Sequence, residues 1–449
     1  MRNTTADYIT GAVSASEGIR DSLVLLNGPL GCRFYHGYAS GQSLLKESEL
    51  WDLRGELRLE NAMDDRLLRS QYFAGTPQVP GSNLRYEDNI FGTWEQLERA
   101  LLDILCERRY SFLTVIQTPG TSLLGEALEQ RIQTVAERFE VPCLYVESPH
   151  FSENSFSGYD ETVKRLLEML VRRDVPRTKR ERPRVNLFGF YTYEKFLEGD
   201  VREIQRLLAL SGIDVACTVC ADCMTEELSR IPDAELNLFL SPERCSVTRT
   251  YIEKTLGLPV LDFGCMPVGF DLTERFVREV AGRLETDASA ALADIEKARA
   301  RAFYFLAGKL GAKDFPEDIG YAIEGERSVL YAWTDFLSGY LGMRPIAVHV
   351  LYETCPVHTG KTPEELLEKM GVSEALQQDI RKVKDAIVIG NANTIMEAFL
   401  YSSNLYGVEI ANPSSGYLHV VPKTYLGSSG ALYLLEQLLN GMRMLQAWE

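Results

Sequence analysis

Three cysteines lie within seven residues of this chain, and their type and spacing make them the residues best suited to chemistry. They are Cys217, Cys220 and Cys223, in the stretch ACTVCADCM at 216–224. Two consecutive two-residue gaps allow thiolates from one short loop to bind a single iron–sulfur cluster, which needs cysteine ligands at close quarters. A metal site is therefore the first hypothesis for this loop. The alternatives are reduced structural thiols, because free cysteine is among the most buried residue types, or a redox or disulfide function.

A four-iron cluster usually has four protein ligands, so a fourth must come from elsewhere in the chain or one iron stays open. The sequence does not decide whether Cys245, Cys265 or Cys355 supplies it. Cys106 and Cys143 occur within apolar helix and strand patterns, and we expect both of them in the core. Five histidines are too few to predict a histidine-rich metal centre.

Composition limits the class of protein. The chain has 449 residues, 45% hydrophobic and 25% charged, which predicts two to four ordinary globular domains. The net charge of −17 argues against a nucleic-acid partner, because phosphate binding needs a basic face. No apolar run reaches the ~18–20 residues of a membrane span, and the N-terminus lacks an apolar signal core. Together with nine cysteines, these features predict a cytoplasmic protein with no membrane partner.

The elements that must position these residues follow a strand–helix–strand order. The first group of expected elements comprises strands at 22–27, 112–117 and 142–147 and a helix over 122–139. A basic, proline-broken linker follows at 171–184. The second group comprises strands at 185–190, 213–216, 236–240 and 260–262, with helices at 201–211 and 246–256. The third comprises a long helical stretch over 272–310 and strands at 328–331, 344–350 and 386–389.

This alternation predicts an α/β fold of three doubly wound parallel-sheet (Rossmann-like) domains, covering residues 1–180, 181–290 and 291–449. The last strand runs into the turn GNAN at 390–393, the kind of strand-to-helix turn where open α/β sheets bind ligands. The chain has no Walker phosphate loop and no G-x-G-x-x-G fingerprint, so we do not expect it to hydrolyse nucleotides.

Five segments, in chain order, resemble the motifs of one protein family. They are GPLGC at 28–32, similar to H-G-P-x-G-C; YEDNIFG at 86–92, similar to T-E-D-x-x-F-G; TPGTSLLGE at 118–126, similar to C-P-x-x-x-I-G-D-D; VNLFG at 185–189, similar to V-N-x-x-G; and PKTYLGSSGA at 422–431, similar to P-x-x-x-x-G-x-x-G-A. By these motifs the chain resembles the nitrogenase component 1 superfamily, which includes the nitrogenase catalytic subunits, their cofactor-assembly scaffolds, protochlorophyllide reductase subunits and nitrogenase-like reductases. The resemblance covers nearly the whole chain and implies a component 1-like fold.

The resemblance assigns Cys32 to the electron-relay cluster between paired subunits. The family uses three cysteines per subunit for this cluster, and the other two positions fall on Ala6 and Thr118 in this chain. The resemblance therefore implies a smaller interface cluster of the 4Fe–4S type, completed by a homologous or identical subunit. Glu126 resembles an acidic position near the relay, although an acidic residue also favours the early turns of a helix.

The resemblance also implies a second cluster or a larger metallocofactor. The cysteine that binds the family's active-site cluster falls near Ser241, with Cys245 four residues further on, and the family's histidine ligand falls close to His419. Cys245 and His419 thus join Cys32 and the three cysteines of 217–223 as candidate cofactor-binding residues. The family's ordinary catalytic subunits lack the cysteine triple, which we expect to face the substrate cavity. No catalytic residue is predicted.

Three functions agree with this resemblance. The first is a reductase subunit that takes electrons from an ATP-dependent iron protein, through the interface cluster, to a metal or small-molecule substrate site near residues 217–223. The second is a scaffold that holds a precursor cluster during cofactor assembly. The third is a non-catalytic partner subunit, which the cysteine triple disfavours.

Overall fold

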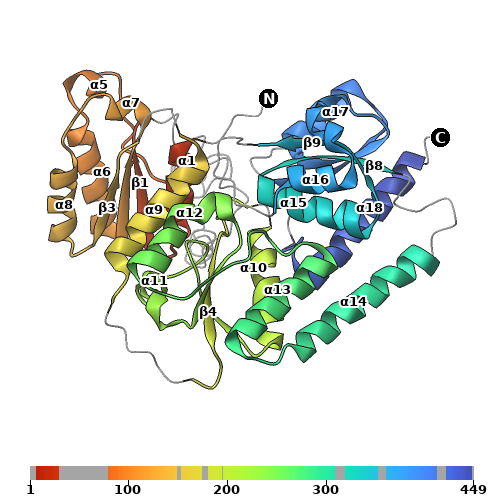
Figure 1. The fold of residues 1–449 in the computed structure, drawn as a ribbon. Helices are drawn as coiled ribbons and strands as arrows, with labels where there is room; N and C mark the ends of the chain where they lie inside the picture. Colours follow the sequence, from red (N-terminus) through yellow and green to blue (C-terminus); the bar gives the residue numbers. More distant parts are fainter. Residues whose placement is uncertain are drawn as a thin grey trace, which may run out of the picture.

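The structure, a computed structural model, describes residues 7–29, 79–148, 153–173, 180–194, 196–308, 319–351, 361–411 and 421–446. Its described part contains three parallel sheets with helices packed on them. Figure 1 shows the three units in chain order, with the first at the left, the second below and the third at the right. The expected α/β class with three parallel-sheet units is confirmed.

The first sheet has the order β1-β2-β3, with all strands parallel. Its strands are β1 (Ser22–Asn27), β2 (Phe112–Gln117) and β3 (Cys143–Val146). Side chains alternate between the faces of a strand, and Leu23 and Leu25 pack in one core while Val24 and Leu26 pack in another. One face is covered by α1 (Tyr8–Glu17) and α9 (Ser155–Leu170), the other by α6 (Trp94–Glu107) and α8 (Glu129–Arg138).

Two short helices lie after the strands of the first unit, namely α5 (Asp88–Phe91) and α7 (Pro119–Ser122). The expectation of a single helix over 122–139 is wrong, because Gly125 has φ +64 and the chain leaves the helical conformation there before α8 begins.

Helices α1 and α9 cross at two glycines. A Cβ atom at Gly11 would overlap the Ser155 carbonyl, and one at Gly158 would overlap the Tyr8 carbonyl. Only glycine permits so close a backbone approach. The crossing fixes Tyr159, the residue that follows Gly158, against the second unit.

The second sheet has the order β5-β4-β6-β7, again parallel. Its strands are β4 (Arg184–Phe188), β5 (Asp214–Thr218), β6 (Leu236–Phe239) and β7 (Val260–Asp262). One face is covered by α10 (Leu197–Leu210) and α13 (Gly269–Leu284), the other by η2 (Ile231–Asp233), α11 (Thr225–Ser229), α12 (Pro242–Thr250) and the π-helical turn η3 (Tyr251–Thr255). The strand order reverses between β4 and β6, so this sheet has its topological switch point there.

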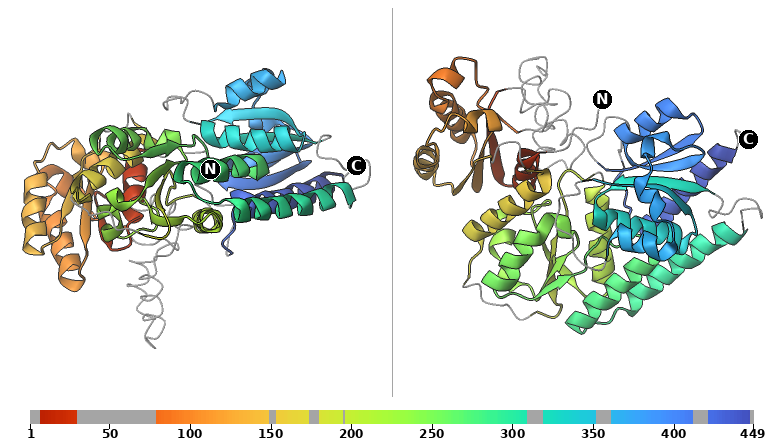
Figure 2. Two further views of the ribbon diagram at one scale, coloured as in Figure 1. Left: turned by 60° about the horizontal axis from the view of Figure 1, so that its bottom comes forward. Right: turned by 45° about the horizontal axis from the view of Figure 1, so that its top comes forward.

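The helical stretch expected over 272–310 is two helices. Glu285 ends α13 in the left-handed conformation (φ 55), and α14 (Ser289–Gly308) follows. Figure 2 shows α14 beside the last helix, α18 (Gly427–Gln446), and the two are in contact.

The third sheet has the order β11-β10-β8-β9. Its strands are β8 (Gly320–Gly325), β9 (Arg344–Val350), β10 (Ala386–Asn391) and β11 (Leu405–Ala411). The remaining elements are α15 (Arg327–Thr334), η5 (Asp335–Tyr340), α16 (Pro363–Met370), η6 (Ser373–Gln377), η7 (Ile380–Lys382) and α17 (Ala392–Tyr401).

The strand expected at 328–331 is wrong, because these residues form α15. The Glu243 carboxylate of the second unit accepts hydrogen bonds from Ser328 N (2.6 Å) and Ser328 Oγ (2.7 Å), which satisfies the helix N-terminus. The strands β8 and β11 were not expected from the sequence.

Two hydrophobic cores cross the boundaries between units. One contains Val24 and Leu26 of the first sheet together with Phe188 and Phe239 of the second. The other joins α10 and α13 of the second unit to α18 and to the third sheet. The three sheets are therefore held as one packed body. Within the described ranges, no helix has the length and apolarity needed to span a bilayer.

Candidate metal centre

The cysteine triple lies on the loop that leaves β5 and leads into α11. Cys217 is the fourth residue of β5, and Cys220 and Cys223 follow in the turn. The three side chains are buried, with exposed fractions of 3%, 0% and 1%, and all three are free thiols. All three thiols pack in a hydrophobic core that also contains side chains of the first and second sheets. They therefore lie at the joint between these two units.

The backbone of this loop is unusual. Cys220 has φ 52 and Asp222 has φ 68, the left-handed conformation that non-glycine residues rarely adopt. Such conformations cost roughly 1–3 kcal/mol each and persist where the surrounding structure enforces them. The enforcing contacts come from α1 of the first unit.

The end of α1 covers the cysteine loop. Cys223 N donates to Gly18 O (3.0 Å), and Arg20 N donates to Cys223 O (2.8 Å). A Cβ atom at Gly18 would overlap the Cys220 carbonyl. Thr192 Oγ1 donates to Cys220 O (3.1 Å) and Ser14 O (3.0 Å), which ties the loop to α1 from the other side. The loop therefore lies between the first and second units.

Cys245 lies on α12 and faces the same core. It is 2% exposed and is the one residue of that helix with a non-helical backbone, at φ −140 and ψ 16. The helix restarts after it, and the Asp160 carboxylate accepts from Val247 N (2.7 Å) and Thr248 N (2.8 Å). Asp160 thus satisfies the N–H groups that the break at Cys245 leaves without helical partners.

Tyr159 connects the two cysteine-bearing segments. Its hydroxyl donates to Phe190 O (2.7 Å) and contacts Val219 O (3.4 Å), beside Cys220. Its neighbour Asp160 is the residue that holds the segment after Cys245. Burial raises the pKa of Tyr159 well above its ordinary value, with further contributions from the nearby thiols of Cys220, Cys245 and Cys223.

The surroundings of Cys217, Cys220 and Cys245 raise the pKa of each of these thiols and so favour the neutral form. A hydrogen bond with Cys223, followed by burial, raises the pKa of Cys217 well above its ordinary value. Burial, followed by neighbouring thiols, does the same to the pKa of Cys220. Burial also raises the pKa of Cys245, and the Asp160 carboxylate adds to the effect. Because a metal binds thiolate, loading this site must release protons.

Four thiols are a suitable donor set for iron, but they do not surround one point. No group of three His, Cys, Asp or Glu side chains in the described residues is placed to hold a single metal ion. A tetrahedral zinc ion needs its sulfurs at about 2.3 Å from one point, an arrangement that the described thiols do not offer. An iron–sulfur cluster binds each thiolate at a different iron, and it is compatible with thiols spread over one loop and a facing helix.

A second group of buried polar residues lies where the three units meet. Arg244 is 5% exposed and pairs with Glu194 of the second unit and with Glu326 of the third (2.6 Å). Its guanidinium also lies 5.1 Å from the ring centre of Tyr191. Burial raises the pKa of both glutamates, while Arg244 opposes that rise. This network fixes the start of α12 against α15.

Ser241 lies at the switch point of the second sheet. It is 2% exposed, and its hydroxyl has no hydrogen-bond partner within the residues that the structure describes. Gly189, at the end of β4 with φ +104, has the Ser241 backbone so close that a Cβ atom would lie 2.7 Å from Ser241 N. Ser241 thus offers a buried hydroxyl, and no thiolate, at this point of the sheet.

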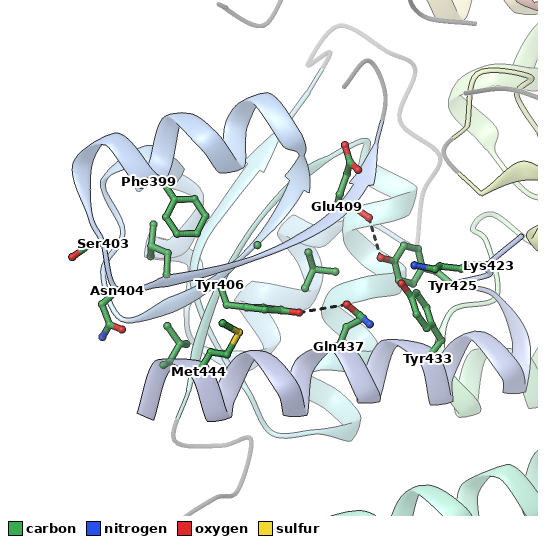
Figure 3. Close-up of a pocket in the computed structure, with 14 residues that line it drawn as sticks. Phe399, Ser403, Asn404, Tyr406, Glu409, Lys423, Tyr425, Tyr433, Gln437 and Met444 are labelled. Atoms are coloured by element: carbon green, nitrogen blue, oxygen red, sulfur yellow. Dashed lines mark hydrogen bonds between the residues drawn. The ribbon is translucent and has the colours of Figure 1, made fainter. Parts of the chain in front are cut away.

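A cavity of about 400 Å³ lies at the outer edge of the third sheet, between β11, the end of α17 and α18. Figure 3 shows Tyr406 extending between β11 and α18 toward Gln437, while Tyr425 donates to Glu409 O (2.9 Å). Its size and aromatic lining are typical of small-molecule pockets. Within the described part of the chain, its lining contains no cysteine or histidine, so none of the four thiols borders it.

The predicted site residues have different outcomes. Cys32 and His419 lie outside the described residues, and so does Cys355. Cys265 is buried in the other core, with α10 and α13, away from the cysteine triple. Cys143 is 1% exposed, as expected.

Two expectations about single residues are corrected. Cys106 is exposed, because it lies off the stripe of Leu97, Leu101 and Leu105 by which α6 packs. Glu126 does not support its own helix; its carboxylate accepts from Thr93 N (2.9 Å) and Thr93 Oγ1 at the start of α6.

Sequence reasoning missed Tyr159, Asp160 and Arg244. The first two form part of an ordinary amphipathic helix pattern and gave no local signal. Arg244 did have a local signal in the sequence. It stands directly before a candidate ligand cysteine at the start of a helix, and this is an unusual place for a residue that is rarely buried.

Comparisons with known proteins agree with this architecture. A stretch of 173 residues, 36% of this chain, is 30% identical to a subunit of the light-independent protochlorophyllide reductase of Synechococcus sp. (strain WH7803), of which it covers 32%. The chain is 23% identical over 313 residues to the nitrogenase iron-molybdenum cofactor biosynthesis protein NifE of Methanosarcina barkeri, covering 65% of this chain and 60% of that protein. The matched parts thus span between a third and three-fifths of these relatives.

Solved structures show the same fold. The structure of nitrogenase Cp1 at pH 6.5 superposes with a TM-score of 0.74 at 16% identity and covers all of this chain and 95% of the other. The model of the family described as nitrogenase component 1 type oxidoreductase matches residues 9–443. The chain therefore belongs to the nitrogenase component 1 type oxidoreductase family.

Proposed function

We propose that this chain is a subunit of a nitrogenase-like reductase and receives electrons from an ATP-dependent iron protein. The family match over residues 9–443 carries this proposal, and the likeness to a protochlorophyllide reductase subunit supports it. The seven described cysteines are all free thiols, which suits the reducing cytoplasm in which we place the protein.

The entry point for electrons is an apolar surface of the first unit, here called the docking surface. It consists of Tyr86, Ile90, Phe91, Leu123 and Leu124, of which Phe91 is 85% exposed. The two segments of this surface, 86–91 and 123–124, lie side by side (Figure 1). The Glu126 carboxylate, just after the second segment, accepts a hydrogen bond from Thr93 N at the start of α6, which follows the first segment. Contiguous exposed apolar residues of this size mark protein interaction sites.

The docking surface adjoins the position from which the relay would start. It lies at the carboxyl ends of β1 and β2, and Cys32 follows β1 by five residues. In this proposal, Cys32 and ligands from a homologous or identical subunit hold a 4Fe–4S cluster at the subunit interface. That pairing makes the working protein an oligomer.

The three cysteines of 217–223 hold a second cluster in this proposal, and such a cluster supplies low-potential electron storage when it is bound. The chain's own contribution is to position it: the end of α1 excludes water from the loop, and Tyr159 and Asp160 fix the segments on either side. A small-molecule substrate is then reduced where the three units meet, at the start of α12.

A second function, a scaffold for cofactor assembly, is favoured by one observation. The match to NifE covers a larger share of this chain than the match to the reductase subunit does, 65% against 36%. A scaffold would hold its cluster on the same thiols but would release it to an acceptor protein and would not use it for turnover.

The proposal is tested by electron transfer from a reduced iron protein with MgATP to the oxygen-free oligomer, followed by its visible absorption. We expect transfer that Phe91→Ala slows by roughly tenfold or more, as at an interface hot spot. Phe303→Ala is the matched control, because Phe303 is also exposed (68%) but lies on α14. Absence of any transfer, together with transfer of iron and sulfide to an acceptor protein, would favour the scaffold. Equal rates for both variants would reject the docking surface.

A further inference from the structure

We infer that Cys245 is the fourth thiol ligand of the cluster held by Cys217, Cys220 and Cys223, which makes the joint between the first and second units a closed four-thiol site for a 4Fe–4S cluster. This inference deepens the proposed function and rests on it. From the sequence alone, Cys245, Cys265 and Cys355 are equal candidates. Within the described residues, the structure distinguishes Cys245 from Cys265 as a candidate ligand.

Packing separates Cys245 from Cys265. Cys245 shares a core with all three cysteines of the loop, whereas Cys265 belongs to the core on the opposite face of the second sheet. The second sheet separates the two cores, so Cys265 packs on the other side of the sheet from the three cysteines of the loop. Cys245 lies on the same face of the second sheet as the loop, in the core that contains all three of its cysteines.

Hydrogen bonds tie Cys245 to the loop through α9. The chain of contacts runs from Val219 O, next to Cys220, to the Tyr159 hydroxyl, and from Asp160 to Val247 N and Thr248 N. Thr248 Oγ1 also donates to Asp160 O (3.1 Å). Two neighbouring residues of one buried helix thus hold both thiol-bearing segments, which fixes the distance between them.

The backbone at both segments departs from regular structure at the cysteines themselves. Cys220 is left-handed, and Cys245 is the one break in α12. A buried structural cysteine needs neither, because a small apolar side chain packs from an ordinary helix or turn. The left-handed backbone at Cys220 and the helix break at Cys245 set the directions of these two thiols.

The chemistry of loading is balanced within the site. Four thiols give up four protons as their sulfurs bind four different irons, and no electron is transferred in this step. The protons must leave through the loop, since the site is closed by Gly18 and the end of α1. We therefore expect the cluster to be inserted slowly and, once in place, to resist chelators.

The test compares Cys245→Ser with Cys265→Ser in the full-length protein, purified without oxygen. Both positions are buried, with exposed fractions of 2% and 0%, so the same substitution is matched for burial. We expect Cys245→Ser to lose about four irons and four sulfides per chain, or to show the electron paramagnetic resonance signal of a three-iron cluster. Cys265→Ser should keep the iron, the sulfide and the signal of the wild type.

A measurement on the wild-type chain covers the case in which the Cys245 variant does not fold. Hydrogen–deuterium exchange is compared before and after reconstitution with iron and sulfide. Protection should rise in the peptides that cover 217–223 and 242–250 and stay unchanged around Cys265. Unchanged exchange at 242–250, or a full iron content in Cys245→Ser, overturns the inference.

These outcomes are independent of the proposed function. If the cluster is present with Cys245 as a ligand but accepts no electrons from an iron protein, the reductase proposal fails and the ligand assignment stands. If electrons are accepted while Cys245→Ser keeps all its iron, the ligand assignment fails and the reductase proposal stands.

Discussion

A buried carboxyl at the joint between the second unit and the last helix should make the stability of this protein depend on pH. Asp200 lies in the first turn of α10, and burial raises its pKa from 3.8 to about 8. Its Oδ1 accepts from Thr424 Oγ1 (2.6 Å) and Tyr425 N (3.0 Å), just before α18. The nearby Glu194 adds to the rise in pKa.

The sign follows from proton linkage. Between pH 4 and pH 8 the native state holds a proton on Asp200 that the unfolded chain has lost, so the free energy of unfolding falls as the pH rises. The loss is about 1.4 kcal/mol per pH unit well below the folded pKa and about half of that at pH 8, where the folded group is half ionised, so it amounts to roughly 2.3 kcal/mol between pH 6 and pH 8. For a unit of 150–250 residues this corresponds to a decrease in Tm of about 5–10 °C.

Asp200→Asn keeps the Oδ1 acceptor and removes the titration. We expect the variant to match the wild type near pH 5 and to be more stable at pH 8, with a nearly flat contribution between. The assay is the thermal unfolding midpoint at half-unit pH intervals. Glu198→Gln, a partly exposed acid in the same helix turn, is the matched control and should leave the wild-type slope unchanged. A variant with the same slope as the wild type would refute the reasoning.

Two further predictions concern packing at the joints. Gly18→Ala should lower stability by about 1–3 kcal/mol, because its Cβ would overlap the Cys220 backbone, and should speed reaction of the loop thiols in iron-free protein with a thiol reagent. Gly282→Ala, in an open position on α13, is the control and should raise stability by up to about 1 kcal/mol. Equal rates of thiol labelling in the Gly18 and Gly282 variants would contradict the conclusion that the end of α1 covers the loop. Arg244→Met should cost about 3–5 kcal/mol, because two buried carboxylates lose their cation, and changing both to glutamine as well should recover most of it. If the unfolding midpoint of that triple variant stays as low as that of Arg244→Met, the ion network is not what holds the units together.

Much of the fold was predictable because several strands can be recognised from their local sequence alone. β1, β2 and β10 are continuous apolar runs bounded by polar or turn residues, as strands buried on both faces must be. The failures lie where tertiary contacts decide. Residues 328–331 have the β-branched and aromatic composition of a strand, yet Glu243 from another unit caps them as a helix.

The candidate site was predictable only in part. Spacing made the cysteine loop a candidate, because its three cysteines are close in sequence. The proposed partner, Cys245, comes from a different element, and its placement depends on Tyr159 and Asp160, which lie more than 80 residues before it. No periodicity in the sequence records that contact.

The core that the first two sheets share has a consequence during synthesis. When the ribosome has completed α9, the face of the first sheet with Val24 and Leu26 has helices over it but still lacks Phe188 and Phe239. The chain must be extended by about 90 residues before β7 emerges, which takes about 5–18 s at usual translation rates. Throughout that interval the nascent chain exposes half of an unfinished core, so efficient folding in the cell should depend on chaperones that bind this intermediate.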